Sequence, residues 1–177
     1  MVGAQLVTAL QQIVARNVDP LEAAVLSICE FHAGNARNVI PQSAVLRGTV
    51  RTLTPKVREL MEKRVREVVT GVAQMTGAKI DLSYTRGYPV VVNHAEQTEI
   101  AIRAAKEVAG DANVHEMPPM MGGEDFAYML EARPGAFIFV GNGDSAGLHH
   151  PAYNFNDEAI VYGTSFFIKV VENTLAA

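Results

Sequence analysis

The order of helical and strand patterns in residues 1–88 constrains the fold of this chain more than any other feature. Segments with helical and strand spacing follow one another as helix, strand, strand, helix and strand, at residues 6–17, 23–32, 43–52, 55–77 and 79–88. This order is that of the split βαβ or ferredoxin-like motif, β-α-β-β-α-β, without its first strand. We therefore expect residues 1–88 to form an incomplete ferredoxin-like domain whose sheet has an unpaired edge, a feature that favours association with another chain.

The second helical segment has clear signals at both ends. Thr54 can cap its N-terminus and Pro55 suits the first helical position, whereas Gly77 is typical of the residue that follows a helix. We expect a helix from Pro55 to about Gly77.

From residue 89 the pattern changes to shorter helices and apolar runs joined by turns, which predicts a second, α/β domain over residues 89–177. We expect a helix at about 96–108, a short helix after Gly123 and a buried strand at 136–140. A loop at 141–156 then leads to a last helix, which Asn156 caps. The chain as a whole is thus expected to mix α and β structure in two domains.

Composition narrows the range of partners. The chain has a net charge of −4 and a pI near 5.7, and its Lys and Arg residues are scattered, so we expect neither a nucleic-acid nor an anionic-membrane partner. No apolar run approaches the ~20 residues that cross a bilayer. Cys29 is the single cysteine, which excludes an intrachain disulfide and favours a cytoplasmic location, and we expect it to be a buried residue of the first strand.

The loop at 141–156 contains the first candidate for chemistry. His149 and His150 follow a predicted buried strand and precede a helix, which is where sites form in α/β folds. An imidazole there can bind a metal ion, but one ligand cannot hold zinc, which needs three or four. The alternative is a surface histidine without a function.

Two further groups of residues could contact a substrate. Gly122 and Gly123 with Glu124 begin a short helix, where backbone N–H groups favour an anion, although plain helix capping explains the same residues. Asn38 lies in the connection between the first two strands and Arg51 near the end of the second, and an amide and a guanidinium both suit a carboxylate. The alternative for both is a solvated turn and a solvated strand end.

Taken in order, short strings of residues resemble the aminoacylase, hippurate hydrolase and indoleacetyl-amino-acid hydrolase group of di-metal peptidases. The resemblance covers essentially the whole chain, and the strings that carry it are Asn38-Val39-Ile40-Pro41, Gly48-Thr49-Val50-Arg51, Gly123-Glu124-Asp125-Phe126 and Leu148-His149-His150-Pro151 through Phe155-Asn156-Asp157-Glu158. In that group, a catalytic domain with two metal ions is interrupted by a βαββαβ lid through which subunits dimerise. The resemblance implies a lid at 1–88 that lacks its first strand and the C-terminal portion of the catalytic domain at 89–177.

The resemblance also implies roles for particular residues. His149 matches the last metal ligand of the group, with His150 at a position often filled by other residues. Asn38 and Arg51 match lid residues that reach the substrate, in part across the dimer, and the turn from Gly122 through Glu124 matches part of the cleft wall. The general-base Glu and the remaining ligands belong to segments upstream of this chain, so no catalytic residue is expected within it.

The activity implied by the resemblance is metal-dependent hydrolysis of small N-acyl amino acids by a homodimer. Two divalent ions, zinc, manganese or cobalt, are implied for the intact enzyme, whereas the isolated chain is expected to bind none and to be inactive. The alternative is a ferredoxin-like module that binds a small molecule or dimerises without catalysis. The acyl group and the amino acid are not specified by these residues.

Overall fold

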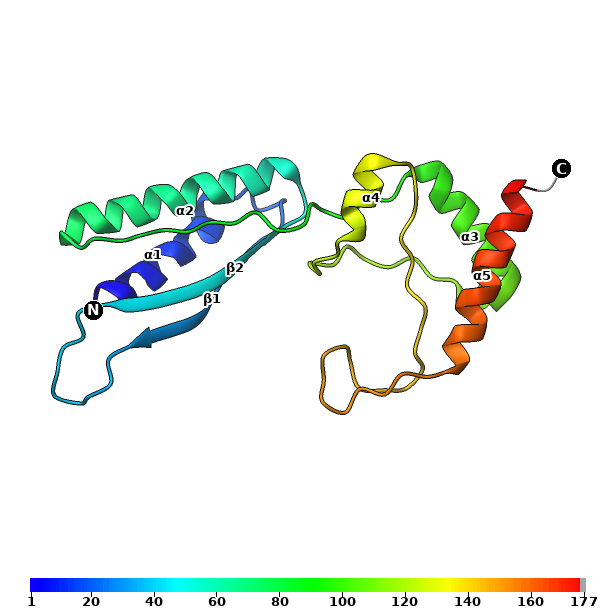
Figure 1. The fold of residues 1–177 in the computed structure, drawn as a ribbon. Helices are drawn as coiled ribbons and strands as arrows, with labels where there is room; N and C mark the ends of the chain where they lie inside the picture. Colours follow the sequence, from blue (N-terminus) through cyan, green and yellow to red (C-terminus); the bar gives the residue numbers. More distant parts are fainter. Residues whose placement is uncertain (176–177) are drawn as a thin grey trace. The chain divides into compact units, whose positions relative to one another are not determined.

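The structure of the chain is a computed structural model that describes residues 1–175. It is a mixed α and β fold that divides into two compact units (Figure 1). The first unit contains residues 1–90 together with Pro119–Gly123, and the second contains Val91–Pro118 and the chain from Glu124 onward. No helix among the described residues is long and apolar enough to span a membrane.

The first unit is a β-hairpin covered on one face by two helices. Its elements are α1 (Val2–Asn17), β1 (Ala24–Ala33), β2 (Ala44–Thr52) and α2 (Pro55–Thr76), which confirms the expected helices and the first two strands. The two strands are antiparallel, in a register that runs from Ala24 opposite Thr52 to Ala33 opposite Ala44. A β-bulge interrupts this register on β1 between Ile28 and Glu30.

The core of this unit lies between the helices and the hairpin. Ile13 of α1 and Met61 of α2 are fully buried, and Leu26 of β1 reaches them from the sheet. Figure 1 shows α1 and α2 along the same face of the hairpin. The apolar stripe of each helix is therefore what joins helix to helix and both helices to the sheet.

Both ends of α2 follow the predicted signals. The Thr54 hydroxyl accepts a hydrogen bond from the Val57 N–H at 3.3 Å, and Pro55 occupies the first helical position. Gly77 adopts the left-handed conformation, with φ of 70°, and its N–H donates to the Ala73 carbonyl at 2.9 Å. The local capping residues thus decided where this helix begins and ends.

The strand expected at 79–88 does not form, and this prediction was wrong. The segment is held along α2 by side chains instead: Arg86 Nε donates to Glu62 at 2.6 Å, and Arg58 donates to the Gly87 carbonyl at 2.6 Å. Ile80 packs against the core, as a strand residue would. In the complete split βαβ motif, the first strand lies between β2 and this segment, and the described residues hold no strand there. A segment without a neighbouring strand cannot form a ladder of hydrogen bonds.

The second unit is built on two packed helices. Its elements are α3 (Ala95–Ala109), a 3₁₀ turn η1 (Asp111–Asn113), α4 (Phe126–Ala132) and α5 (Glu158–Leu175). Ala101 and Ala104 of α3 pack against Phe166 of α5, where the small alanine side chains let the aromatic ring approach the helix.

The buried strand expected at 136–140 is also absent from the described residues. Phe139 and Val140 are about half exposed. The Asn93 side chain makes the hydrogen bonds that a neighbouring strand would make to Phe137. Its amide donates to the Phe137 carbonyl at 2.9 Å, and its oxygen accepts from the Phe137 N–H at 2.8 Å. The physical reason is the same as at 79–88: the segment has no partner strand among the described residues.

Candidate functional site

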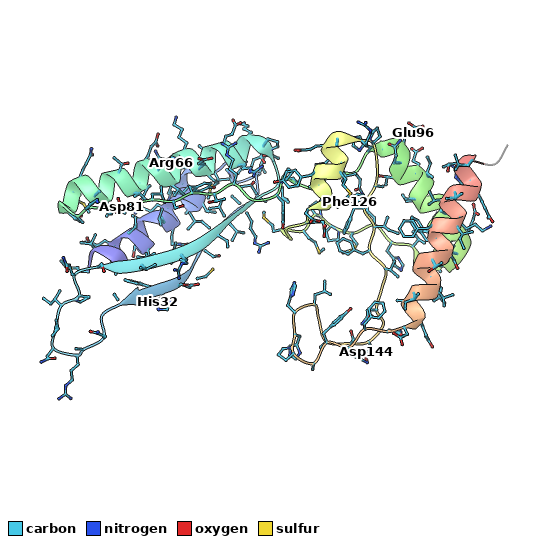
Figure 2. The ribbon with its side chains drawn as sticks, in the orientation of Figure 1. His32, Arg66, Asp81, Glu96, Phe126 and Asp144 are labelled. Atoms are coloured by element: carbon cyan, nitrogen blue, oxygen red, sulfur yellow. The ribbon has the colours of Figure 1, made fainter. Side chains whose placement is uncertain are left out.

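The loop at 141–156 is closed at its base by one asparagine. The Asn142 side chain donates to the Asn154 carbonyl at 2.8 Å and accepts from the Asn156 N–H at 2.8 Å. Asn156 caps α5 as predicted, since its side-chain oxygen accepts from the Glu158 N–H at 3.0 Å. Figure 2 places Asp144 in this loop, next to the start of α5. The loop therefore projects from a fixed base.

His149 lies at the far side of this loop in an unusual conformation. Among the described residues, it is the one non-glycine residue with a positive φ, 67°. Left-handed backbone is unfavourable for most residues, and such outliers are found disproportionately at functional sites. Its ring is exposed and makes no hydrogen bond with any described residue, so both ring nitrogens are open to a ligand.

His150 differs from His149 in the state of its ring. Its ring Nδ1 accepts a hydrogen bond from the Ala152 N–H at 3.0 Å, and the backbone N–H of His150 donates to the Gly147 carbonyl at 3.1 Å. A neutral imidazole whose Nδ1 accepts carries its proton on Nε2. Neither ring nitrogen of His150 then has a free lone pair for a metal ion, whereas the ring of His149 does.

The grouping of possible metal ligands can be examined among the described residues. No group of three or more His, Cys, Asp or Glu side chains with suitable geometry is present in the described part of the chain. A structural or catalytic zinc site takes at least three protein ligands. His149 therefore belongs to no metal-binding group within the described part of the chain.

Arg51 contacts the glycine-containing segment that the sequence analysis also selected. Its Nη1 donates to the Met121 carbonyl at 2.5 Å, although the two residues are 70 positions apart. Arg51 is exposed on the face of β2 opposite the core, and no carboxylate among the described residues pairs with it. Arg51 and Gly122 are separate candidates in the sequence, and only the fold brings Arg51 to the residue that precedes Gly122.

Position 48, the first of the Gly48-Thr49-Val50-Arg51 string, has no room for a side chain. A Cβ at position 48 would lie 2.3 Å from the Ser27 carbonyl oxygen, next to the β-bulge of β1. Gly48 therefore allows β1 and β2 to pair at the bulge. The register that follows is what sets Arg51 opposite Val25 at the end of the hairpin.

Glu124 caps the start of α4, which was the alternative to binding an anion. Its carboxylate accepts a hydrogen bond from the Phe126 N–H at 3.1 Å, at the start of α4. The N–H group that was expected to favour an external anion is thus already occupied by Glu124. Gly122 and Gly123 belong to the first unit with Arg51, and Glu124 begins the next segment of the second.

Asn38 and Arg51 lie at opposite ends of the same hairpin. Asn38 is exposed in the turn that joins β1 to β2, beyond the Ala33–Ala44 pair, whereas Arg51 is next to the other end of β2. The residues from Ala44 to Arg51 span roughly 24 Å at about 3.4 Å per residue. One small ligand cannot contact both residues of one chain.

The exposed face of the hairpin carries a second arginine that is already paired. Arg47 donates to the Glu30 carboxylate at 2.6 Å, and His32 lies 3.4 Å from the same carboxylate (Figure 2). The hydrogen bond and the charge of Arg47 hold the pKa of Glu30 below its ordinary value. Cys29, expected to be buried, is exposed because the alternation of β1 places it on the face opposite Leu26 and Ile28, which α1 and α2 do not cover.

Among the described residues, two units of mixed α and β structure carry an exposed imidazole at His149 without a hydrogen-bond partner and an arginine, Arg51, without an acidic partner. The sequence model of the peptidase family M20/M25/M40 matches residues 3–173. The chain belongs to this family.

Curated relatives and solved structures agree with this assignment. YhaA of Bacillus subtilis is 40% identical in an alignment that covers 91% of this chain and 42% of YhaA. Hippurate hydrolase of Campylobacter jejuni is 36% identical, over 93% of this chain and 43% of its own length. N-acetyldiaminopimelate deacetylase of Streptococcus thermophilus is 36% identical, over 90% of this chain and 42% of its own length.

Two solved structures have the same fold. YXEP of Bacillus subtilis, described as a dinuclear metal binding peptidase of the M20 family, superposes with a TM-score of 0.72 at 31% identity, over 98% of this chain and 45% of YXEP. A protein of methicillin-resistant Staphylococcus aureus gives 0.75 at 31% identity, over 96% of this chain and 44% of that one. The chain therefore spans less than half the length of the relatives it matches, and these relatives are hydrolases.

Proposed function

We propose that this chain supplies the lid and the C-terminal part of the catalytic domain of an M20-family amidohydrolase that cleaves N-acyl amino acids. The observation that carries this proposal is the similarity, over nine-tenths of the chain, to a hippurate hydrolase and to an N-acetyldiaminopimelate deacetylase. The names of both relatives describe removal of an acyl group from an amino acid. Hydrolysis then requires the portion of the family protein that these residues do not cover.

An exposed apolar face on α5 supports the need for that portion. The side chains of Val161, Phe167 and Leu175 are between 66% and 75% exposed, on a helix that otherwise packs against α3. Large apolar patches on a folded domain mark surfaces that another part of a protein covers. The rest of a catalytic domain is a suitable cover for this helix.

His149 is the residue of this chain that we assign to the metal site. Its open imidazole supports this assignment, as does the engaged ring of His150. Two divalent metal ions, when bound in such an enzyme, supply a Lewis acid and an activated water. His149 would hold one ion, and the backbone at its positive φ would orient the ring.

The lid residues would bind the substrate carboxylate. Arg51 carries an unpaired positive charge on the exposed face of β2, and a guanidinium can bind a carboxylate through two parallel hydrogen bonds. The distance between Asn38 and Arg51 supports an arrangement in which Asn38 acts at the site of a second subunit. Such sharing requires a homodimer, and the free edge of β1 provides a surface on which lids can associate.

A non-catalytic module is the alternative function. The absence of a metal-binding cluster from the described residues and the free edge of β1 would both fit a domain that only dimerises or binds a small molecule. The two functions differ in one respect: a part of an enzyme becomes active when the missing part is supplied, whereas a binding module does not.

The test is a hybrid enzyme in which this chain replaces the corresponding 43% of the Campylobacter jejuni hippurate hydrolase. We expect the hybrid to hydrolyse N-benzoylglycine and the isolated chain to show neither turnover nor stoichiometric metal. His149→Ala should lower the activity of the hybrid by more than about 100-fold, because loss of even an outer partner of a metal ligand costs 10–100-fold.

His150→Ala is the matched control, since it removes a neighbouring imidazole and should leave most of the activity. Loss of activity in His150→Ala but not in His149→Ala would contradict the assignment of the ligand. A folded, metal-loaded hybrid with no activity on any N-acyl amino acid would favour the non-catalytic module.

A further inference from the structure

The segment Pro119–Gly123, here called the strap, belongs to the first unit although the chain on both sides of it belongs to the second. It contains no helix or strand, so no backbone ladder fixes its position. Arg51 of β2 reaches it directly, with 2.5 Å between Nη1 and the Met121 carbonyl oxygen. One side chain of the hairpin thus contacts the backbone of the strap.

The glycines of the strap are not required by the conformation in which they are found. A Cβ on Gly122 would meet no atom within 4 Å, and one on Gly123 would meet only the Tyr88 ring, at an ordinary 3.6 Å. Neither glycine has a positive φ. Their effect is therefore to leave the backbone free to adopt many conformations, which makes an ordered strap depend on an external contact.

Arg51 has donors left over for a ligand. A guanidinium carries five N–H groups, and the strap uses one of them. Arg47, which shares the exposed face of β2, differs because its charge is already paired with Glu30. A carboxylate that reaches this face would therefore meet one arginine that is free of acidic partners and one that is not.

We propose that Arg51 is a positioning residue that anchors the strap, and that a carboxylate ligand bound through its remaining N–H groups strengthens this anchor. The second part rests on the proposed function, and the first does not. The physical reason for the coupling is entropic: a ligand that immobilises the guanidinium removes part of the cost of holding the bond to Met121. Carboxylate binding and order in the strap then increase together.

The first experiment measures backbone order in the chain without a ligand, by ¹⁵N relaxation at Met121, Gly122 and Gly123. We expect order parameters between about 0.6 and the rigid value of about 0.85 in the ligand-free wild type, and a fall below about 0.6 in Arg51→Ala. Arg47→Ala is the matched control, because it removes the same side chain from the same face without touching the strap. Amide shifts of α1 and α2 verify that each variant is folded.

Arg51→Lys separates anchoring from a general loss of charge. A lysine keeps the charge and can donate to Met121, but it lacks the planar fork, so we expect partial recovery of order in the strap. Unchanged order parameters in a folded Arg51→Ala variant, or an equal loss of order in Arg47→Ala, would overturn the anchor.

The second experiment adds N-benzoylglycine, with N-benzoylglycinamide as the ligand that lacks the carboxylate. We expect the acid to shift the Arg51 Nε resonance and to raise the order of Gly122 and Gly123, and the amide to do neither. A shift at Arg51 without a change in the strap would overturn the coupling and leave the proposed function standing. No shift at Arg51 would count against carboxylate binding, and thus against both the coupling and the substrate-binding role in the proposed function. The first experiment alone decides whether Arg51 anchors the strap.

Discussion

Replacing Met61 by alanine should destabilise the first unit strongly. The Met61 side chain is 0% exposed and packs between α2 and α1, where Ile13 is equally buried. Truncation removes its contacts and leaves a cavity, which for a buried methionine costs about 2–5 kcal/mol. A unit of this size has a total stability of roughly 5–14 kcal/mol, at about 0.05–0.15 kcal/mol per residue, so the loss is a large fraction of the total and the variant should unfold at lower denaturant.

Urea unfolding followed by the amide resonances of α1 and α2 measures this change, because those signals report the first unit alone. Met75→Ala is the matched control: it makes the same substitution in the same helix, at a side chain that is 69% exposed. Its effect should stay within about 0.5 kcal/mol. Equal effects of the two substitutions would show that α1 and α2 do not pack in solution as they do in the structure.

Two further predictions concern the same unit. Gly48→Ala should destabilise it by about 1–3 kcal/mol, measured by the same urea titration, because the new methyl group would meet the Ser27 carbonyl and force the strands apart; an unaffected midpoint would contradict this packing. Hydrogen bonds from Arg66 and Arg86 lower the pKa of Glu62 below its ordinary value of 4.5, so its contribution to stability is present above that pH and is lost as the pH falls through the lowered pKa. Glu62→Gln should therefore lower the urea midpoint at neutral pH and have progressively less effect below pH 4.5, whereas a difference that persists in acid would refute the linkage.

The helices could be predicted because their signals are local. The period of the apolar residues and the caps at Thr54 and Gly77 act within a few residues of the chain, and α2 begins and ends where they indicated. The strands were predicted less well, since alternation gives a segment the capacity to pair but does not supply a partner. Residues 44–52 have a neighbour and form β2, whereas 79–88 and 136–140 have none among the described residues and stay extended.

For the candidate site, too, the sequence indicated some features and only the structure decided others. The sequence by itself determined the family resemblance and the selection of His149 and Arg51 as candidates, because residue type and short motifs carry that information. Only the tertiary structure decided that the ring of His150 is occupied, that Asn38 lies a hairpin's length from Arg51, and that Arg51 reaches the Met121 carbonyl 70 residues away. The His150 contact is local but depends on how the loop is folded, because its partner is the Ala152 N–H. The other two are distances between separate segments, and they exist only once the register of the hairpin and the return of the strap have been set.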